Sequence, residues 1–213
     1  MFTEVNWVDY SKVKIRYEIA LYQFERECKL LRVRFKGSYG YGSDGNGDAA
    51  YMDAMYRAAF EVLHPDGLIL DFSELSYQWG DLLGQVLNTP DQWPERERPP
   101  FALVLGAMSE EGVRSLLLND LGWHTDELTW VFNEPLAAQA FVEEVMRERC
   151  AAMHQRIEAD KRDRAQSFWQ LLGPDIGPER CRSEGCDRLR IKNSVLCRAH
   201  HYERVQHEPC PFE

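Results

Sequence analysis

The stretch "GLILDFSELSYQWGDLLGQVL", residues 67–87, decides the fold that we expect for this chain of 213 residues. Its first six residues form an apolar run broken only by Asp71, which is typical of a strand covered on both faces. Residues 80–87 place leucine and valine at helical spacing and predict a short helix. A buried strand followed by a helix is the repeating unit of an α/β fold with a parallel sheet.

Strands and helices alternate on both sides of this unit. Before it, residues 13–21 and 31–35 alternate between apolar and polar, which predicts an antiparallel hairpin. We also expect a helix over 49–63, strands over 101–106 and 128–132, and helices over 109–120 and from 134 onward. The chain therefore predicts an α/β fold with a mostly parallel sheet and an antiparallel N-terminal hairpin.

The last helix extends far beyond the expected core. Its apolar spacing continues to about residue 172, although charged residues interrupt the stripe over 160–164. We predict one long helix, with a compact pair of helices as the alternative. Glycine and proline in "GPDIGP", residues 173–178, end it. The expected domains are a core over 1–146, a helical arm over 147–172 and a tail module over 173–213.

Composition restricts the classes of partner. The formal net charge of -10 argues against nonspecific coating of nucleic acid or of an anionic membrane. No apolar run approaches the roughly 18 to 20 residues that span a bilayer, and the N-terminus lacks the pattern of a signal peptide. We expect a cytoplasmic protein without membrane association.

The stretch around Asp71 resembles the central strand and following helix of STAS domains, the family of sulfate transporter and anti-sigma factor antagonist domains. The resemblance covers about residues 13–146 and includes "LLRVRFKGSYG", "FALVLG" and "WVFNEPLAAQAF". It implies a STAS-like core over these residues, with the helical arm over 147–172 outside it, and a regulatory protein of bacterial or phage type. Regulatory members carry a phosphorylatable Ser or Thr where this chain has Gly80, so the resemblance also implies that the phosphorylation switch is absent.

Cysteines are distributed unevenly along the chain. Cys28 and Cys150 stand alone, whereas the other four lie in the tail. In a reducing cytosol this clustering favours a metal site over disulfides.

The tail spacing predicts a structural zinc site. Two cysteines with four residues between them form one pair, and a Cys-x2-His motif forms the second. Three thiolates and one imidazole make a closed tetrahedral set for Zn²⁺. The pattern is similar to small zinc modules of phage and bacterial proteins. His201 and Cys210 stay open as alternative ligands. The set that we predict is Cys181, Cys186, Cys197 and His200.

Basic residues in the tail allow a nucleic-acid hypothesis. The candidate contacts are Arg188, Arg190, Lys192 and Arg198. Nearby acidic residues offset them, and aromatic residues that could stack on bases are scarce.

The core offers little for catalysis. Asp71, Trp79 and Asp81 follow one core strand, where open α/β sheets place a ligand or partner crevice. In "SDGNGD", residues 43–48, we expect Asp48 to cap the next helix.

Our leading hypothesis is a non-enzymatic, zinc-containing interaction protein that docks a protein partner through its α/β core. Tryptophans 79, 93 and 123 suit such docking. The alternatives are an antagonist of immunity type that neutralises an effector, a nucleic-acid-associated protein that uses the zinc tail, and a hydrolase or nuclease accessory with Asp71 and Asp81 in its crevice. The apolar stripe beyond the core also suggests a homodimer through the long helix.

Overall fold

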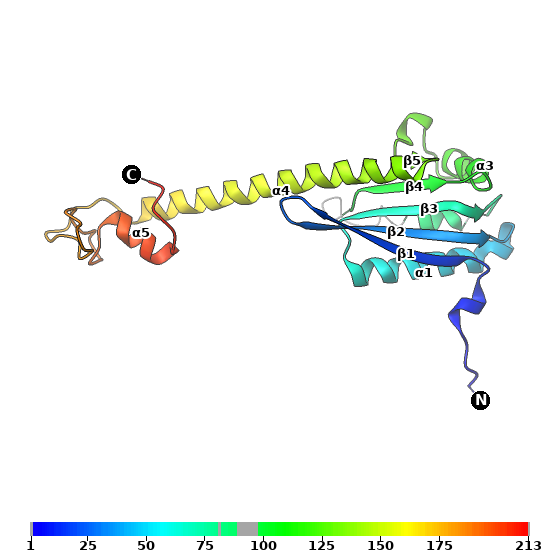
Figure 1. Cartoon of the computed structure of the whole chain (residues 1–213), viewed down its shortest axis with the longest axis horizontal. Coiled ribbons are helices and arrows are strands. Elements are labelled where there is room, and N and C mark those ends of the chain that lie inside the picture. Colours follow the sequence, from blue (N-terminus) through cyan, green and yellow to red (C-terminus); the bar gives the residue numbers. More distant parts are fainter. Residues whose placement is uncertain (1, 81, 89–97, 213) are drawn as a thin grey trace. The chain divides into compact units, whose positions relative to one another are not determined.

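A mixed sheet organises the N-terminal part of the chain (Figure 1). The structure is a computed structural model that describes residues 2–80, 82–88 and 98–212, apart from the side chains of Trp7 and Asn88. Within these residues the sheet has five strands in the order β1-β2-β3-β4-β5. β1 and β2 are antiparallel, and the other neighbours are parallel. The strands are β1 (Lys14–Gln23), β2 (Glu27–Ser38), β3 (Gly67–Ser76), β4 (Phe101–Leu105) and β5 (Val131–Phe132).

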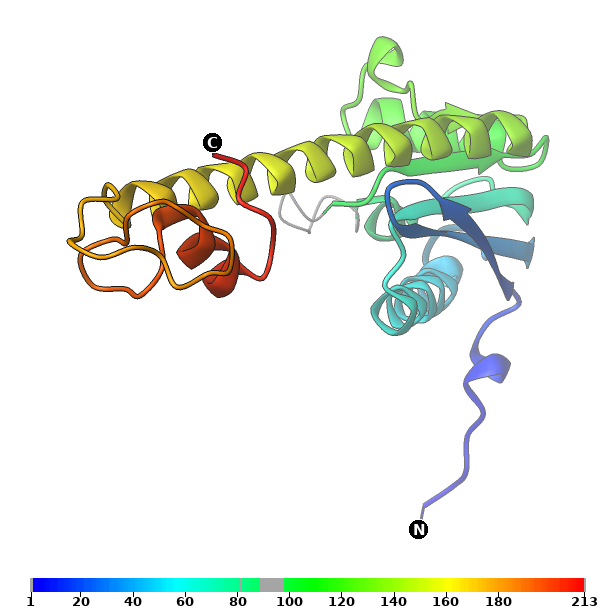
Figure 2. The same cartoon turned by 60° about the vertical axis from the view of Figure 1, so that its left-hand side comes forward.

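Helices cover both faces of this sheet (Figures 1 and 2). One face packs against α1, α2, α3 and the π-helical turn η4, and the other packs against the first half of α4. The helices are α1 (Asn46–Leu63), α2 (Leu83–Asn88), α3 (Glu110–Ser115), η4 (Leu116–Asp120), α4 (Pro135–Leu171) and α5 (Arg198–Gln206). Short 3-10 turns are η1 (Trp7–Tyr10), η2 (Gly42–Gly45) and η5 (Thr125–Glu127).

The strand pattern explains the two cores. Leu31, Leu70 and Phe72 point to the face covered by α1 and are fully buried. Ile69 and Val104 point to the opposite face and pack against α4. Because successive strand residues face opposite sides, a strand buried on both faces needs the continuous apolar run seen in β3.

The predicted fold class is confirmed. The sheet is mostly parallel with an antiparallel N-terminal hairpin, and the long helix α4 runs without a break over 37 residues. The alternative of a compact helix pair is therefore wrong. The chain divides into two compact units, Met1–Ala151 and Ala152–Glu213, so that the division falls within α4.

Two local details differ from the expectations. β3 continues past Asp71 to Ser76, because its parallel pairing with β2 resumes after an irregularity in register. β5 has only two residues instead of five, since residues 129–130 form a turn just before it.

Asp48 does not cap α1. It lies in the first turn, and its carboxylate accepts hydrogen bonds from the Ser11 hydroxyl at 2.6 Å, from the Lys12 N–H at 3.2 Å and from the Gly40 N–H at 2.9 Å. The residue thus ties two distant segments to α1.

Candidate metal centre

The tail brings four soft ligands to one point through two local turns. Gly185 has a φ of +73°, a left-handed conformation that glycine adopts without strain, and it reverses the chain just before Cys186. An isolated bridge between Arg180 and Leu189 closes this turn. α5 begins directly after Cys197, which places His200 in the first turn of the helix.

The ligand atoms have the spacing that a tetrahedral metal requires. The Nδ1 atom of His200 lies 3.3 Å from the Sγ atoms of both Cys181 and Cys197. The Sγ atoms of Cys186 and Cys197 are 3.9 Å apart, and all four ligand atoms lie within 4.8 Å of one another. Zn–S bonds of about 2.3 Å and Zn–N bonds of about 2.0 Å give tetrahedral edges of roughly 3.5–3.8 Å. The donor set fits a structural zinc ion.

The two alternative ligands lie outside this cluster. The Nδ1 atom of His201 is 2.7 Å from the hydroxyl of Ser194. The thiol of Cys210 donates to the carbonyl oxygen of Phe212 at 3.6 Å. Consecutive helical residues point in different directions, which explains why His200 joins the cluster and His201 does not.

The ionisation of the Cys181 thiol also favours a metal. Burial raises the pKa of Cys181, but hydrogen bonds from the backbone near Cys197 and Ser183 and from His200 lower it overall to about 7. Burial is the main cause that raises the pKa of Cys197 to about 11. A divalent cation would hold these sulfurs as thiolates, because it replaces their protons.

Aromatic packing surrounds the cluster. Trp169, near the end of α4, stacks on Phe212 with ring centroids 5.5 Å apart and meets Tyr202 of α5 edge-on at 6.2 Å. Cys181, Cys197 and Ala199 are buried in the same small core. The last turns of α4 therefore pack with residues 173–212.

The predicted nucleic-acid contacts differ in their surroundings. The Arg198 guanidinium lies 3.9 Å from the centroid of the Trp169 ring and donates to its carbonyl oxygen. Arg190 forms an ion pair with Glu179 at 2.9 Å. Arg188 and Lys192 are exposed. Arg190 and Arg198 thus make contacts inside the module.

Asp71 lies in the middle of β3, and its side chain is fully buried. It accepts hydrogen bonds from Arg32 Nε at 2.9 Å and from the Ser73 N–H at 2.9 Å. Arg34 Nε is 3.5 Å from the same carboxylate. Asp71 therefore has a structural ion-pair role on the face of the sheet that α4 covers in part.

The other residues predicted for the crevice do not join Asp71. Trp79 is 49% exposed and packs against Tyr41 with ring centroids 5.6 Å apart. Asp81 and Trp93 lie outside the described residues. Trp123 is half-buried and meets Trp130 edge-on at 5.6 Å, so of the three predicted docking tryptophans the structure shows only Trp79 as exposed.

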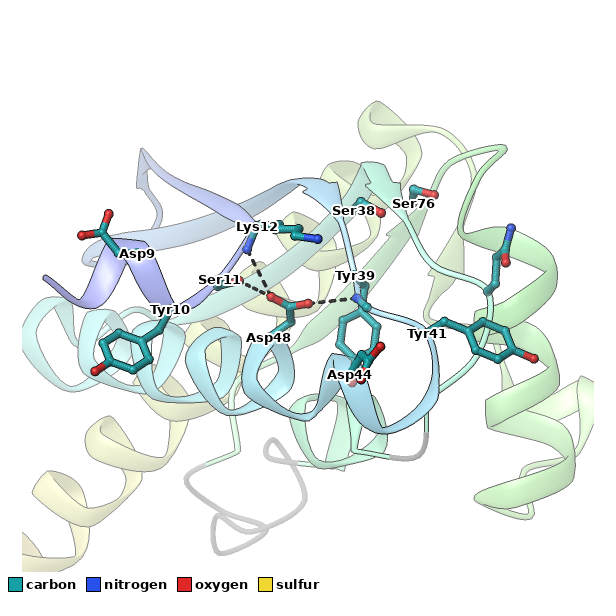
Figure 3. A pocket seen from close by; sticks show the side chains of 12 residues that line it. Asp9, Tyr10, Ser11, Lys12, Ser38, Tyr39, Tyr41, Asp44, Asp48 and Ser76 are labelled. Atoms are coloured by element: carbon teal, nitrogen blue, oxygen red, sulfur yellow. Dashed lines mark hydrogen bonds between the residues drawn. The ribbon is translucent and has the colours of Figure 1, made fainter. Parts of the chain in front are cut away.

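A polar pocket does lie at the carboxyl ends of β2 and β3, with a volume of about 540 Å³ (Figure 3). Its walls include Ser38, Ser76 and Asp44, with Asp48 at its side holding the segment around Ser11. From the sequence we expected a crevice at this edge, but we expected other residues to line it. The missing signal is the N-terminal segment, which lines the pocket and whose Ser11 and Lys12 donate hydrogen bonds to Asp48.

The sequence also did not predict that Cys28 and Cys150 are in contact. In the structure their Sγ atoms are 2.9 Å apart in the core under α4. A separation of 122 residues leaves no local pattern that could predict this contact.

These features define an α/β domain followed by a tail module in which four Cys and His side chains lie close enough to bind a metal ion. No protein family model matches the chain, and no curated protein matches it. A similar solved structure is that of an anti-sigma factor antagonist from Mycobacterium paratuberculosis. It aligns over 61% of this chain and 95% of that chain, with 14% sequence identity and a TM-score of 0.39. That class of protein is the one that the residues around Asp71 resemble.

Among the described residues, no helix is both long enough and apolar enough to cross a membrane.

Proposed function

We propose that this chain is a non-enzymatic interaction protein that docks a protein partner through its α/β core and holds a structural zinc ion in its tail. The observation that carries the docking proposal is the free edge of β1. β1 has ten residues and ends the strand order, and no strand among the described residues pairs with its outer edge. Unpaired backbone N–H and C=O groups at such an edge can bind an extended segment of a partner as an additional strand.

The side chains of β1 support this mode of binding. Tyr17, Ile19 and Leu21 are 39%, 47% and 61% exposed and share one face of the strand. They continue the apolar row that Ile15 begins against the core. The opposite face presents charged residues such as Glu18. A partner segment with alternating apolar and polar residues would cover this row while its backbone completes the edge.

The polar groups of the core support a non-enzymatic protein. Asp71 is engaged by Arg32, Arg34 and the Ser73 backbone, and Asp48 accepts three hydrogen bonds. These buried carboxylates stabilise the fold, and their lone pairs are directed at protein donors.

The metal proposal has a direct test. Protein purified without added zinc should contain about one equivalent of zinc by mass spectrometry of the element. Cys186→Ser should remove most of it, whereas the matched Cys210→Ser variant should keep it. Equal zinc contents in the two variants would show that the ligand set is wrong.

The docking proposal is tested by photo-crosslinking in cells. A photoreactive residue at position 21 should capture a defined partner, whereas the same residue at exposed position 62 on α1 should not. Ile19→Arg should then weaken the partner's affinity by at least about tenfold, because it places a charge in the apolar row. The matched control is Val62→Arg. Capture from position 62 alone, or full affinity of the Ile19 variant, would contradict the proposal.

We also propose that α4 can form a homodimer contact. Met153 and Ile157 lie one turn apart on α4 and are 53% and 42% exposed. Residues spaced by four share one face of a helix, and an apolar face of this kind suits a second helix. A monomeric mass by light scattering at high protein concentration would contradict this contact.

A further inference from the structure

Two buried cysteines outside the metal centre lie in direct contact. Cys28 is the second residue of β2 and is fully buried, and Cys150 is on α4 and is 6% exposed. Their Sγ atoms are 2.9 Å apart, and both belong to the unit formed by residues 1–151. Ile69 and Met146 are among the apolar residues of the same cluster.

We propose that Cys28 and Cys150 form an intrachain disulfide when the protein meets a hydroperoxide. A disulfide has a sulfur–sulfur distance of about 2.04 Å, so the two sulfur atoms need to approach by only about 0.9 Å. Neither thiol contributes to the tail cluster of Cys181, Cys186, Cys197 and His200. The site is thus separate from the metal centre and does not depend on the proposed docking edge.

The reaction balances with one molecule of hydrogen peroxide. The sulfur of Cys150, the more accessible thiol, attacks one peroxide oxygen, and the O–O bond breaks to give a sulfenic acid and water. The sulfur of Cys28 then attacks the sulfenic sulfur, the S–O bond breaks, and the hydroxyl leaves as a second water with the thiol proton. Two thiols are oxidised and one peroxide is reduced.

Burial lowers the rate at which the two thiols are oxidised. Burial, with the hydrogen bond to Cys150 adding to it, raises the pKa of Cys28 to about 12. Its thiol is therefore protonated at neutral pH, and we expect the pair to oxidise more slowly than an exposed cysteine.

The bond would link the start of β2 to the part of α4 that covers the sheet. Cys28 lies next to the hairpin turn, because it pairs with Tyr22 of β1 in the sheet register. The loop that the bond closes contains most of the core, because the two positions are 122 residues apart in the sequence. Closing so long a loop removes chain entropy from the unfolded state and should raise Tm by on the order of 10 °C.

The test uses the full chain saturated with zinc and exposed to hydrogen peroxide at a few equivalents. Free thiols are then alkylated in denaturant, and the protein is digested with trypsin without reduction. The expected product is peptide 27–29 joined to peptide 150–156. Cys28→Ala and Cys150→Ala are matched variants that keep every tail cysteine, and oxidation should raise the Tm of neither.

The peptide analysis of the wild-type protein is the decisive measurement, so the result does not depend on the folding of either variant. The proposal is overturned if both peptides remain alkylated while peroxide has oxidised the half-buried thiol of Cys210. It is equally overturned if Cys28 or Cys150 is found joined to a tail cysteine and never to the other.

Discussion

Replacing Asp71 with asparagine tests the buried ion pairs on the sheet. The change keeps the size of the side chain and the oxygen that accepts from the Ser73 N–H, but it removes the charge. The Arg32 Nε donor then loses the charge-assisted hydrogen bond that it makes at 2.9 Å. Such a bond contributes about 1.5–3 kcal/mol.

The exposure of the arginines limits the cost. The side chains of Arg32 and Arg34 are 25% and 28% exposed, so water recovers part of the lost interaction. We therefore expect Asp71→Asn to lower the free energy of unfolding by about 2 kcal/mol. With a urea dependence of about 1–3 kcal/mol per M, the unfolding midpoint should fall by about 1 M.

The assay is urea unfolding of the zinc-saturated chain, followed by near-UV circular dichroism. Glu74→Gln is the matched control, because it makes the same chemical change in a side chain that is 40% exposed and contacts Lys36 and Arg34. Its midpoint should stay close to that of the wild type, since exposed ion pairs contribute little. Equal midpoints for Asp71→Asn, Glu74→Gln and the wild type would refute the reasoning.

Three further predictions follow from the core and the tail. Phe72→Ala should lower the free energy of unfolding by about 3–5 kcal/mol, because Phe72 is fully buried edge-on to Phe35 at 5.3 Å; an effect under about 1 kcal/mol in the same urea assay would contradict the packing. Zinc affinity should fall by at least about tenfold per pH unit below pH 7, because the pKa of metal-free Cys181 is about 7 and protons compete for the thiolates. The affinity is measured by competition with a chromogenic chelator, and a constant affinity between pH 7 and pH 5 would contradict this expectation. The zinc-loaded chain should bind single-stranded RNA and duplex DNA with a Kd above about 1 μM at physiological salt, since Arg190 and Arg198 make contacts inside the module. Tighter binding that weakens steeply with salt in a fluorescence anisotropy titration would instead support the nucleic-acid alternative.

Local patterns in the sequence were sufficient for the framework of the fold. The apolar run over 67–72 predicted a strand buried on both faces, and β3 is covered by helices on each side. The alternation over 13–21 predicted the hairpin that β1 and β2 form. Both patterns depend on the direction of successive side chains, which is a property of a few neighbouring residues.

The spacing of the tail residues also predicted which four side chains lie together, since short intervals constrain where side chains can point. The cluster brings together Cys181, Cys186, Cys197 and His200, the four residues that the spacing indicated. Sequence spacing could not predict the charged and polar contacts of the core. Asp71 meets Arg32 across 39 residues, and Asp48 meets Ser11 across 37. Such pairs depend on strand register and chain path, which no local pattern specifies.

The three hydrogen bonds of Asp48 set a boundary for shortening the chain. Its carboxylate is nearly buried, and two of its three donors come from Ser11 and Lys12. A protease that removes residues before Ser11 leaves these bonds intact. A cut after Lys12 would leave a buried negative charge with the Gly40 N–H alone. The first residue that the core cannot lose is therefore Ser11, two positions before the first buried apolar residue of the sheet region, Val13.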